Sequence, residues 1–378
     1  MNTYPLQTTL VGAAPLVRPA PRGAFHYSPV VKTLPGELRA LANASHAVWR
    51  RMTPLLEIAT KRGDNEAMEA QSLIAQIGPE LRNIFSVDRA FFLDLRWLKY
   101  GLHVNLKGGV TKRAVDHILT ECNLNALRYI PVVRPGEDRR IIETWRAAIG
   151  FSARGVCIRT PISGVVRGGG ETLRDELEDL MTELGVERGG TDLFLDLGYI
   201  GDRRPTANDT FNVLQELDPS GWRTLVLAGT VVPDTLKQIP EETIGELTRH
   251  EWLIWNDLAS LGLGRQPGYG DYVIQHPTRP MEGGPGMRAN VRYTGEQRFL
   301  FARGTKLDRG NYGQYQQLCR DLRAQREFRG PRASWGEEQI DACARGEILP
   351  KAPQEWRAIG TSQHIEEIVR LLGNLDAA

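Results

Sequence analysis

Short apolar runs alternate with longer amphipathic segments along the first three quarters of the chain. The run at 27–32 contains two adjacent valines and is too short for a helix, and Pro35 and Gly36 separate it from helix-like sequence that starts at Glu37. The apolar runs number eight and lie at 27–32, 54–58, 90–96, 129–135, 155–161, 192–198, 224–230 and 270–277. The pattern predicts eight strands, and each one but the last is followed by helix-like sequence.

The alternation of strands and helices favours right-handed βαβ crossovers and a parallel sheet. Eight such units in about 250 residues are typical of a (β/α)8 barrel. An open, doubly wound sheet is the alternative, and it would require a glycine-rich phosphate turn after the first strand. Residues 33–37 read TLPGE and are not such a turn. We therefore predict an α/β fold of the (β/α)8, TIM-barrel-like type.

The helices expected between these strands include 111–124 and a segment that carries Ile244, Leu247, Trp252 and Trp255. Beyond residue 277 the pattern changes, because 281–287 is rich in glycine and proline. The later sequence predicts a hairpin at 290–294 and 297–303 and helices at 311–327 and 362–372, the last capped by Ser362 or Thr361.

Three parts follow from this pattern. We predict a Pro-rich N-terminal arm at 1–24, the barrel at 25–280, and a C-terminal α/β extension at 281–378 that packs on the barrel. The extension is either an elaborated eighth βα segment or a small layer over the barrel mouth.

Composition narrows the class of protein. The 378 residues are 41% hydrophobic and 25% charged, which suffices for a large core. The 47 Lys and Arg nearly balance the 46 Asp and Glu, which argues against a protein that coats polyanions but leaves room for a local basic pocket. The four cysteines form no CxxC pair, so a zinc site is not expected. Their scattered positions are typical of a protein in a reducing compartment.

The sequence predicts a cytoplasmic protein. It has no apolar run of about 18 residues, so no membrane span is expected. The apolar stretch at 11–17 is short, is interrupted by Pro15, and has no clean charged leader before it, which is unlike a signal sequence.

Several segments together resemble the beta protein family, which is encoded by phages and by bacterial mobile or defence-associated loci. The matching stretches are Tyr27 to Leu41 (Y-x-P-V-x-K-x-x-x-G-E-L-x-A-L), Pro54 to Ile58 (PLLEI), Gly270 to Tyr272 (GDY), Tyr293-Thr294 followed by Arg303-Gly304, and Gly360 to Ile365 (G-T-S-x-H-I). The resemblance implies a phage or antiphage setting and a protein partner within a defence system. It implies no particular reaction.

Charged and polar residues stand at or near the ends of the predicted strands. In a parallel barrel these ends meet at one mouth, where enzymes of this fold place their chemistry. We take four as catalytic candidates, Lys32, Glu57, Asp94 and Asp196, and five as candidates for binding the substrate, Arg96, Arg134, Arg159, Gln275 and His276. Thr230 ends the seventh strand, while Asp271 starts the eighth and is expected at the opposite face in a structural role.

The mixture of charges predicts a pocket for an anionic ligand, such as a nucleotide or phosphodiester. Lys32, Arg134 and Arg159 would grip a phosphate or carboxylate, since guanidinium groups offer paired donors. Glu57, Asp94 and Asp196 would act as general acid and base or would hold Mg²⁺ beside a phosphate. The competing interpretation is a ring of salt bridges that closes the barrel top and neutralises itself.

A second function class is a non-catalytic interaction module that binds a protein or a nucleic acid. The densest positive patch carries Arg320, Arg323, Arg326, Arg329 and Arg332, whose helical spacing would lay a stripe along a phosphate backbone. Asp321 and Glu327 interleave this stripe, so a solvated face is the favoured interpretation and nucleic-acid binding is not. His276 and His364 are candidates for proton transfer, although a hydrogen-bonded structural role is favoured for both.

Overall fold

The computed structural model describes residues 23, 25–64, 66–86, 88–152, 154–163, 170–201, 205–279, 287–307 and 310–377. The predicted arm at 1–24 lies outside these residues except for Gly23. No helix in this described part of the chain is both long enough and apolar enough to cross a bilayer. All four cysteines are buried, and none forms a disulfide.

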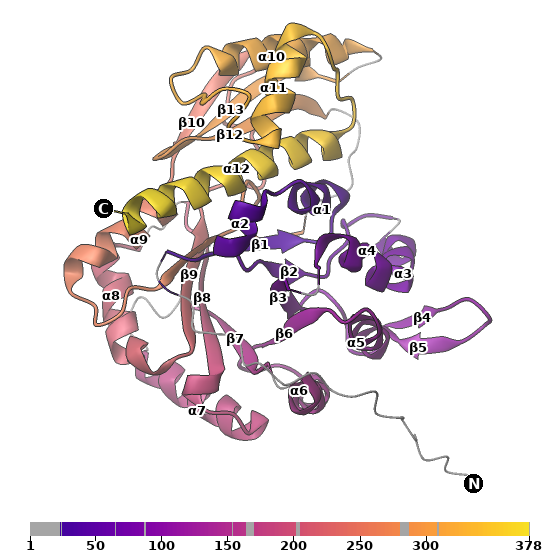
Figure 1. Ribbon diagram of the computed structural model, residues 1–378, viewed down its shortest axis with the longest axis vertical. Coiled ribbons are helices and arrows are strands. Elements are labelled where there is room, and N and C mark those ends of the chain that lie inside the picture. The colour runs from indigo at the N-terminus through magenta and orange to yellow at the C-terminus, as the bar shows by residue number, and fades with distance from the viewer. Residues whose placement is uncertain are drawn as a thin grey trace.

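Eight parallel strands close into a barrel (Figure 1), which confirms the predicted fold. Closure is made by the first and last strands, where Tyr27 lies opposite Tyr269. In chain order the strands are β1 (Tyr27–Lys32), β2 (Leu55–Glu57), β3 (Ala90–Asp94), β6 (Arg128–Val133), β7 (Val156–Pro161), β8 (Thr191–Tyr199), β9 (Thr224–Thr230) and β11 (Gly268–Asp271).

Each barrel strand is buried on both faces, which explains why the strands read as continuous apolar runs. Alternate residues point inward and outward. The inward set forms a core of its own, made by Val30, Leu55, Phe92, Ile130, Val132, Cys157, Phe194, Val226, Ala228 and Tyr272. The outward set, which includes Val31, Leu56, Leu93 and Leu195, packs against the surrounding helices.

Those helices are α1 (Pro35–Ala42), α2 (His46–Arg51), α3 (Glu66–Ala75), α4 (Ile77–Ile84), α5 (Ala114–Leu124), α6 (Arg139–Ser152), α7 (Gly170–Leu184), α8 (Ala207–Glu216) and α9 (His250–Leu258). The prediction of a helix over 111–124 was wrong for its first three residues. They form β5 (Thr111–Arg113), which pairs with β4 (His103–Asn105) in a small hairpin. Gly108 and Gly109 both have positive φ, and this lets the chain turn between the two strands.

The C-terminal region contains a three-stranded antiparallel sheet in the order β10 (Thr243–Thr248), β13 (Arg298–Lys306) and β12 (Arg288–Thr294). The predicted hairpin is confirmed as β12 and β13. The predicted helix with Ile244, Leu247, Trp252 and Trp255 was wrong for its first part, which pairs with β13 as β10. Its second part, with Trp252 and Trp255, is confirmed as α9. Since β10 lies inside the range assigned to the barrel, the division of the chain at residue 280 stays a prediction.

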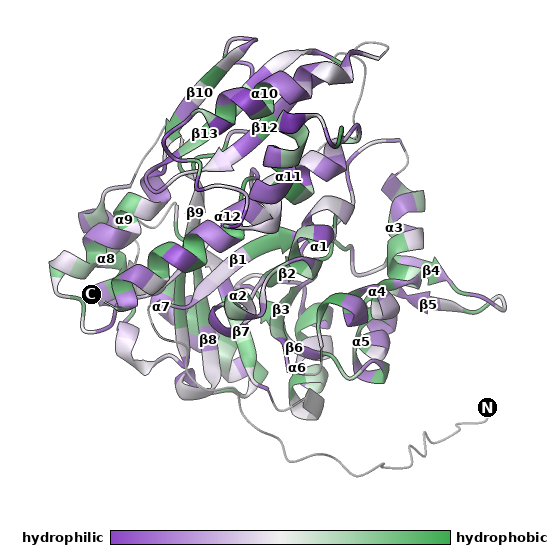
Figure 2. Ribbon diagram, turned by 45° about the horizontal axis from the view of Figure 1, so that its top comes forward, coloured by the Kyte–Doolittle hydropathy of each residue, from purple (hydrophilic) through white to green (hydrophobic). Residues whose placement is uncertain are grey.

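Three helices complete this region: α10 (Gln314–Arg323), α11 (Trp335–Arg345) and α12 (Pro353–Asp376). α12 lies between the barrel and the sheet, with α1 on one side and β12 on the other (Figure 1). It carries hydrophobic and hydrophilic residues in alternating patches along its length (Figure 2). α12 begins at Pro353, so the predicted cap at Ser362 or Thr361 was wrong, and both residues are buried within the helix.

The predicted strand at 270–277 runs instead from Gly268 to Asp271. The chain turns away because Val273 adopts a positive φ of 49° and its N–H donates to Asp271 Oδ1 at 2.9 Å. Asp271 is therefore the last residue of β11, where the sequence had placed it at the start.

Candidate functional site

The strand-end charges converge because each lies two residues beyond an inward-facing core residue. A strand repeats every two residues, so Asp94 follows Phe92 and Asp196 follows Phe194 on the same face. The same relation holds for Val30 and Lys32, Leu55 and Glu57, Val132 and Arg134, and Cys157 and Arg159. The barrel thus directs charges from six strands into one mouth.

Arg159 binds side chains from several other strands. Its Nη1 donates to Glu57 Oε1 and to Asp94 Oδ2, both at 2.7 Å. Nε and Nη2 donate to Asp196 Oδ2 at 3.0 and 2.7 Å, and Nη2 also lies 2.6 Å from the hydroxyl of Tyr272. That hydroxyl donates in turn to Asp196 Oδ2 at 2.5 Å. One guanidinium group therefore ties together three carboxylates and a tyrosine.

Further donors surround this network. Glu57 accepts from Arg96 Nη1 at 3.2 Å and from Trp97 Nε1 at 2.9 Å, and its Oε2 lies 3.9 Å from Lys32 Nζ. Asp94 forms a second ion pair, with Arg134 Nη2. We call these seven charged residues, with Tyr272, the mouth network: Lys32, Glu57, Asp94, Arg96, Arg134, Arg159, Asp196 and Tyr272.

Burial divides the mouth network into a floor and a rim. The floor consists of Lys32, Glu57, Asp94 and Arg159, whose side chains are at most 2% exposed, together with Tyr272 at 1% and the Asp196 side chain at 10%. Two rim cations are accessible, with 19% of the Arg134 side chain and 29% of the Arg96 side chain exposed. A ligand that enters the mouth from solvent would meet these two arginines first.

Neighbouring charged groups set the protonation states of the floor residues. Burial by itself would raise the pKa of Asp94, but Arg134 and Arg159 outweigh it and lower that pKa to about 2. Burial likewise opposes ionisation of Asp196, and Arg159 and the Tyr272 hydroxyl still lower its pKa. Burial raises the pKa of Tyr272 far above its usual value. Asp94 and Asp196 are thus ionised at neutral pH, and Tyr272 is protonated.

The three floor carboxylates do not form a metal site. Among the described residues, no group of three or more His, Cys, Asp or Glu could hold a metal ion. The physical reason is that the Arg159 guanidinium already lies between Glu57, Asp94 and Asp196 and supplies the positive charge that a cation would bring. The residues present therefore do not fit the Mg²⁺ that the acids suggested.

A family model described as Beta protein matches residues 27–370. The chain belongs to the Beta protein family. No curated protein matches the sequence.

Two solved structures overlap this Beta protein family member at low similarity. They are the YdjI aldolase from Escherichia coli K12, at 9% identity and a TM-score of 0.35 over 93% of this chain and 90% of that one, and the fructose-bisphosphate aldolase from Plasmodium falciparum in complex with TRAP and a small-molecule inhibitor. The second overlap has 13% identity and a TM-score of 0.36, and covers 66% of this chain and 81% of that one.

A cavity of about 840 Å³ lies beside the mouth network in this Beta protein family member. It is lined by residues that follow β2 and β3, among them Ile58, Thr60, Trp97 and Lys99, and by Arg279. Trp97 belongs to both places, since its Nε1 binds Glu57 and its ring lies 5.3 Å from the Arg279 guanidinium. This is room of the size that small ligands occupy.

Gln275 and His276 lie outside the strand that was expected to carry them, because β11 ends at Asp271. His276 reaches the mouth network through its backbone carbonyl, which accepts from Lys32 Nζ at 3.2 Å. Its ring bonds Thr278 Oγ1 at 2.9 Å, and burial lowers its pKa. Gln275 lines a different cavity. Tyr272 takes the place expected for them, and its only sequence signal was its position in the GDY stretch.

Thr230 points toward the mouth on the same strand periodicity, two residues beyond Ala228. Its hydroxyl accepts from the Val232 N–H at 3.0 Å, which shapes the loop after β9. It is fully buried.

Asp271 and His364 form a buried chain of hydrogen bonds on the outer side of the barrel. Asp271 accepts from the Tyr27 hydroxyl at 2.6 Å, and its Oδ2 lies 2.8 Å from His364 Nε2. The other ring nitrogen of His364 lies 2.8 Å from Thr294 Oγ1. The order Thr–His–Asp resembles a catalytic triad, but all three residues are at most 1% exposed. The chain instead connects β11, α12 and β12.

The arginine stripe at 320–332 is not a continuous helical face, because α10 ends at Arg323. Arg323 pairs with Asp341 at 2.9 Å, and Arg326 pairs with Glu327 at 3.1 Å. Arg329 pairs with Glu337 and Glu367. Most of the positive charge of the stripe is thus matched by neighbouring acids.

Proposed function

We propose that this protein binds an anionic small molecule, a nucleotide or another phosphate ester, at the carboxyl-terminal mouth of the barrel, in a phage or antiphage setting. The observation that carries the proposal is the pair of accessible rim arginines above a buried, charged floor and beside a cavity. The setting rests on the resemblance to the family alone.

The rim arginines are suited to hold an anion because their positions are set before a ligand arrives. Glu57 anchors Arg96 at 3.2 Å, and Asp94 anchors Arg134, while Glu137 Oε1 lies 3.4 Å from Arg134 Nη1. Side chains that are ordered in advance lose less entropy on binding. Their planar donors match the oxygen geometry of phosphate.

The protonation states of the floor support binding of a ligand rather than its chemical conversion. A general base works best when its pKa lies near the operating pH. The pKa of Asp94 is about 2 and that of Asp196 is lowered, so both are weak bases at neutral pH. If a bound ligand is also processed, Lys32 and Glu57 are the remaining catalytic candidates, with Tyr272 as a hydrogen-bond donor to an anion.

A non-catalytic scaffold is the second candidate, and one observation favours it. Within the mouth network and its neighbour Glu137, four cations face four carboxylates, and the floor is closed to solvent: the cations are Lys32, Arg96, Arg134 and Arg159, and the acids are Glu57, Asp94, Asp196 and Glu137. A ring of this kind can hold eight strands together without a ligand.

The test compares Arg96→Gln and Arg134→Gln with Arg82→Gln, a control at an exposed position on α4. Calorimetric titration with pyrophosphate and with the four common ribonucleoside monophosphates measures affinity. We expect at least one probe to bind the wild type about tenfold more tightly than either rim variant, since a bond to a charged group contributes about 1.5–3 kcal/mol. Equal binding by all four proteins, or no binding at all, would favour the scaffold.

A further inference from the structure

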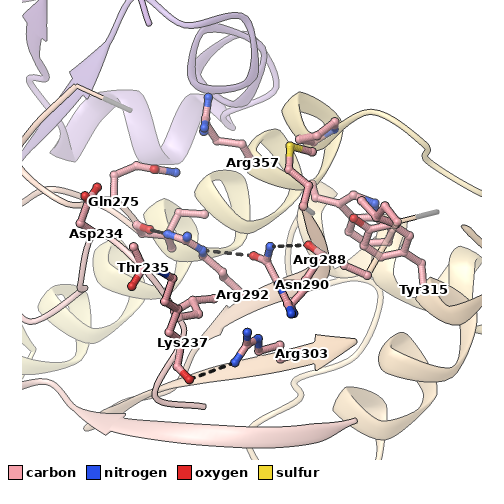
Figure 3. Close-up of a pocket in the computed structure, with 17 residues that line it drawn as sticks. Asp234, Thr235, Lys237, Gln275, Arg288, Asn290, Arg292, Arg303, Tyr315 and Arg357 are labelled. Atoms are coloured by element: carbon pink, nitrogen blue, oxygen red, sulfur yellow. Dashed lines mark hydrogen bonds between the residues drawn. The ribbon is translucent and has the colours of Figure 1, made fainter. Parts of the chain in front are cut away.

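A second cavity, of about 400 Å³, lies between the barrel and the three-stranded sheet (Figure 3). Its walls come from the loops after β9 and β11, from β12 and β13, and from the first turn of α12. These parts are far apart in the chain, and α12 packs against β12 where they meet. The cavity exists only where the two layers join, and we call it the junction cavity.

The walls of the junction cavity are strongly cationic. Asp234 is the one carboxylate among the lining residues, on the barrel side. The cations that line it are Lys237, Arg288, Arg292, Arg303 and Arg357. Arg288 is paired with Glu241, which lies outside the lining. Figure 3 shows Arg292 in the middle of the group and Arg357 extending toward α1.

The two central arginines are bonded to neutral groups. Arg292 Nη1 donates to the carbonyl of Ile274, and its Nε lies 3.4 Å from Asn290 Oδ1. Arg303 Nη1 donates to the carbonyls of Lys237 and Ile239. A carbonyl or amide oxygen fixes a guanidinium group but does not cancel its charge. Arg159 in the mouth network differs, because three carboxylates neutralise it.

Arg292 lies partly buried in this wall, close to a second arginine, Arg357. Burial, and then the charge of Arg357, lower the pKa of Arg292 to about 10. Pro353, at the first position of the 24-residue helix α12, also lines the cavity. The amino end of a helix adds a partial positive charge, which the Glu355 carboxylate partly offsets here by accepting from the N–H groups of Lys351 and Ala352. An anion in the cavity would lower the free energy of all these groups at once.

We propose that the junction cavity is a second anion site, which binds the phosphate or diphosphate group of a small ligand between Arg292 and Arg303. Several guanidinium groups in one hollow match an ion with many oxygens and more than one charge. Leu307 and Met287 form an apolar part of the lining, which would contact a small organic group attached to the phosphate. The proposal is independent of the ligand at the mouth.

Titration of the full chain with pyrophosphate tests the proposal. We expect Arg292→Gln to weaken binding at this site at least about tenfold. Arg326→Gln is the control, since that side chain is 83% exposed and lies outside the cavity. Lys237→Gln, at an exposed lining position, is a second variant that is not expected to unfold the protein, and it should weaken binding severalfold.

The rim variant Arg96→Gln separates the two sites. It should leave the Arg292-dependent binding of pyrophosphate unchanged. If pyrophosphate binding is lost in Arg96→Gln but kept in Arg292→Gln and Lys237→Gln, the ion lies at the mouth, and the junction site is refuted while the proposed function stands. Absence of pyrophosphate binding by the wild type would overturn the junction site as well.

Discussion

Replacing Arg159 by Met tests whether the mouth network is held together by one buried cation. Methionine keeps the apolar stem of the side chain but is shorter, and it removes the charge and every hydrogen bond to the floor. Glu57 would keep Arg96 and Trp97, and Asp94 would keep Arg134. Asp196 would keep no ion-pair partner among the described residues.

The cost of this change follows from what remains around Asp196. Arg159 is its only ion-pair partner among the described residues, and the side chain is 10% exposed. After the substitution it would keep the Tyr272 hydroxyl at 2.5 Å and the N–H of Gly198 at 2.8 Å, both neutral donors. Leaving a buried charge without its partner costs about 3–5 kcal/mol. We expect a loss of that size in the free energy of unfolding at pH 7.5.

A double variant isolates this cause. Arg159→Met with Asp196→Asn carries one more substitution than Arg159→Met alone, yet it removes the orphaned charge. We therefore expect the double variant to be about 1–3 kcal/mol more stable than the single one, because a neutral amide costs less to bury than an unpaired carboxylate.

The dependence on pH gives a second check. In the wild type the pKa of Asp196 is lowered, so its stabilisation is present above the unfolded value near 4 and is lost as pH falls below it. In Arg159→Met burial would raise this pKa, and the protonated form would then stabilise the variant at low pH. The difference in stability between the two proteins should shrink from pH 7.5 to pH 4.5.

Urea unfolding followed by tryptophan fluorescence at both pH values measures these differences. The reasoning is refuted if Arg159→Met lies within about 1 kcal/mol of the wild type at pH 7.5, which is far below the range for an orphaned buried charge. It is also refuted if the double variant is less stable than Arg159→Met.

Two further predictions concern buried groups outside the mouth network. Burial raises the pKa of Glu251 to about 7, so stability that is present below pH 4.5 is lost as pH rises through 7. In the wild type this titration should lower the free energy of unfolding by about 3 kcal/mol between pH 5 and pH 9. Glu251→Gln should abolish that decrease, which is measured as a flatter curve of unfolding free energy against pH. His364→Ala should cost about 2–4 kcal/mol and lower the melting temperature, because it opens a cavity and takes a partner from Asp271. A melting temperature equal to that of the wild type would show that the hydrogen-bond chain is not needed to join α12 to β11.

The barrel was predictable because parallel strands are buried on both faces and so appear as apolar runs. β8 is the clearest case, since its residues from Thr191 to Leu197 are all buried. β10 was not predictable from the same signal. Ile244 and Leu247 are three residues apart, which is typical of a helix, and only the pairing of this segment with β13 makes it a strand.

The convergence of the charges was predictable, and their arrangement was not. Six apolar runs end in or are followed by a charged residue, and in a parallel barrel the carboxyl ends of the strands meet at one mouth. Which face each side chain takes depends on register, and here each charge follows an inward residue by two positions, as Asp94 follows Phe92. Tyr272 was missed because the positive φ of Val273 ends β11 early, and a backbone angle leaves no mark in hydropathy. The junction cavity was missed because its walls come from layers whose packing no local pattern encodes.

The segment 272–276 joins the mouth network to the junction cavity. Tyr272 binds Asp196, the carbonyl of Ile274 accepts from Arg292, and the carbonyl of His276 accepts from Lys32. Val273 between them holds a left-handed conformation that is unfavourable for a β-branched residue and costs on the order of 1–3 kcal/mol. Such a conformation persists only while its neighbours restrain it. An anion that draws Arg292 away from Ile274 would remove one restraint, so its binding energy would include the strain of this segment.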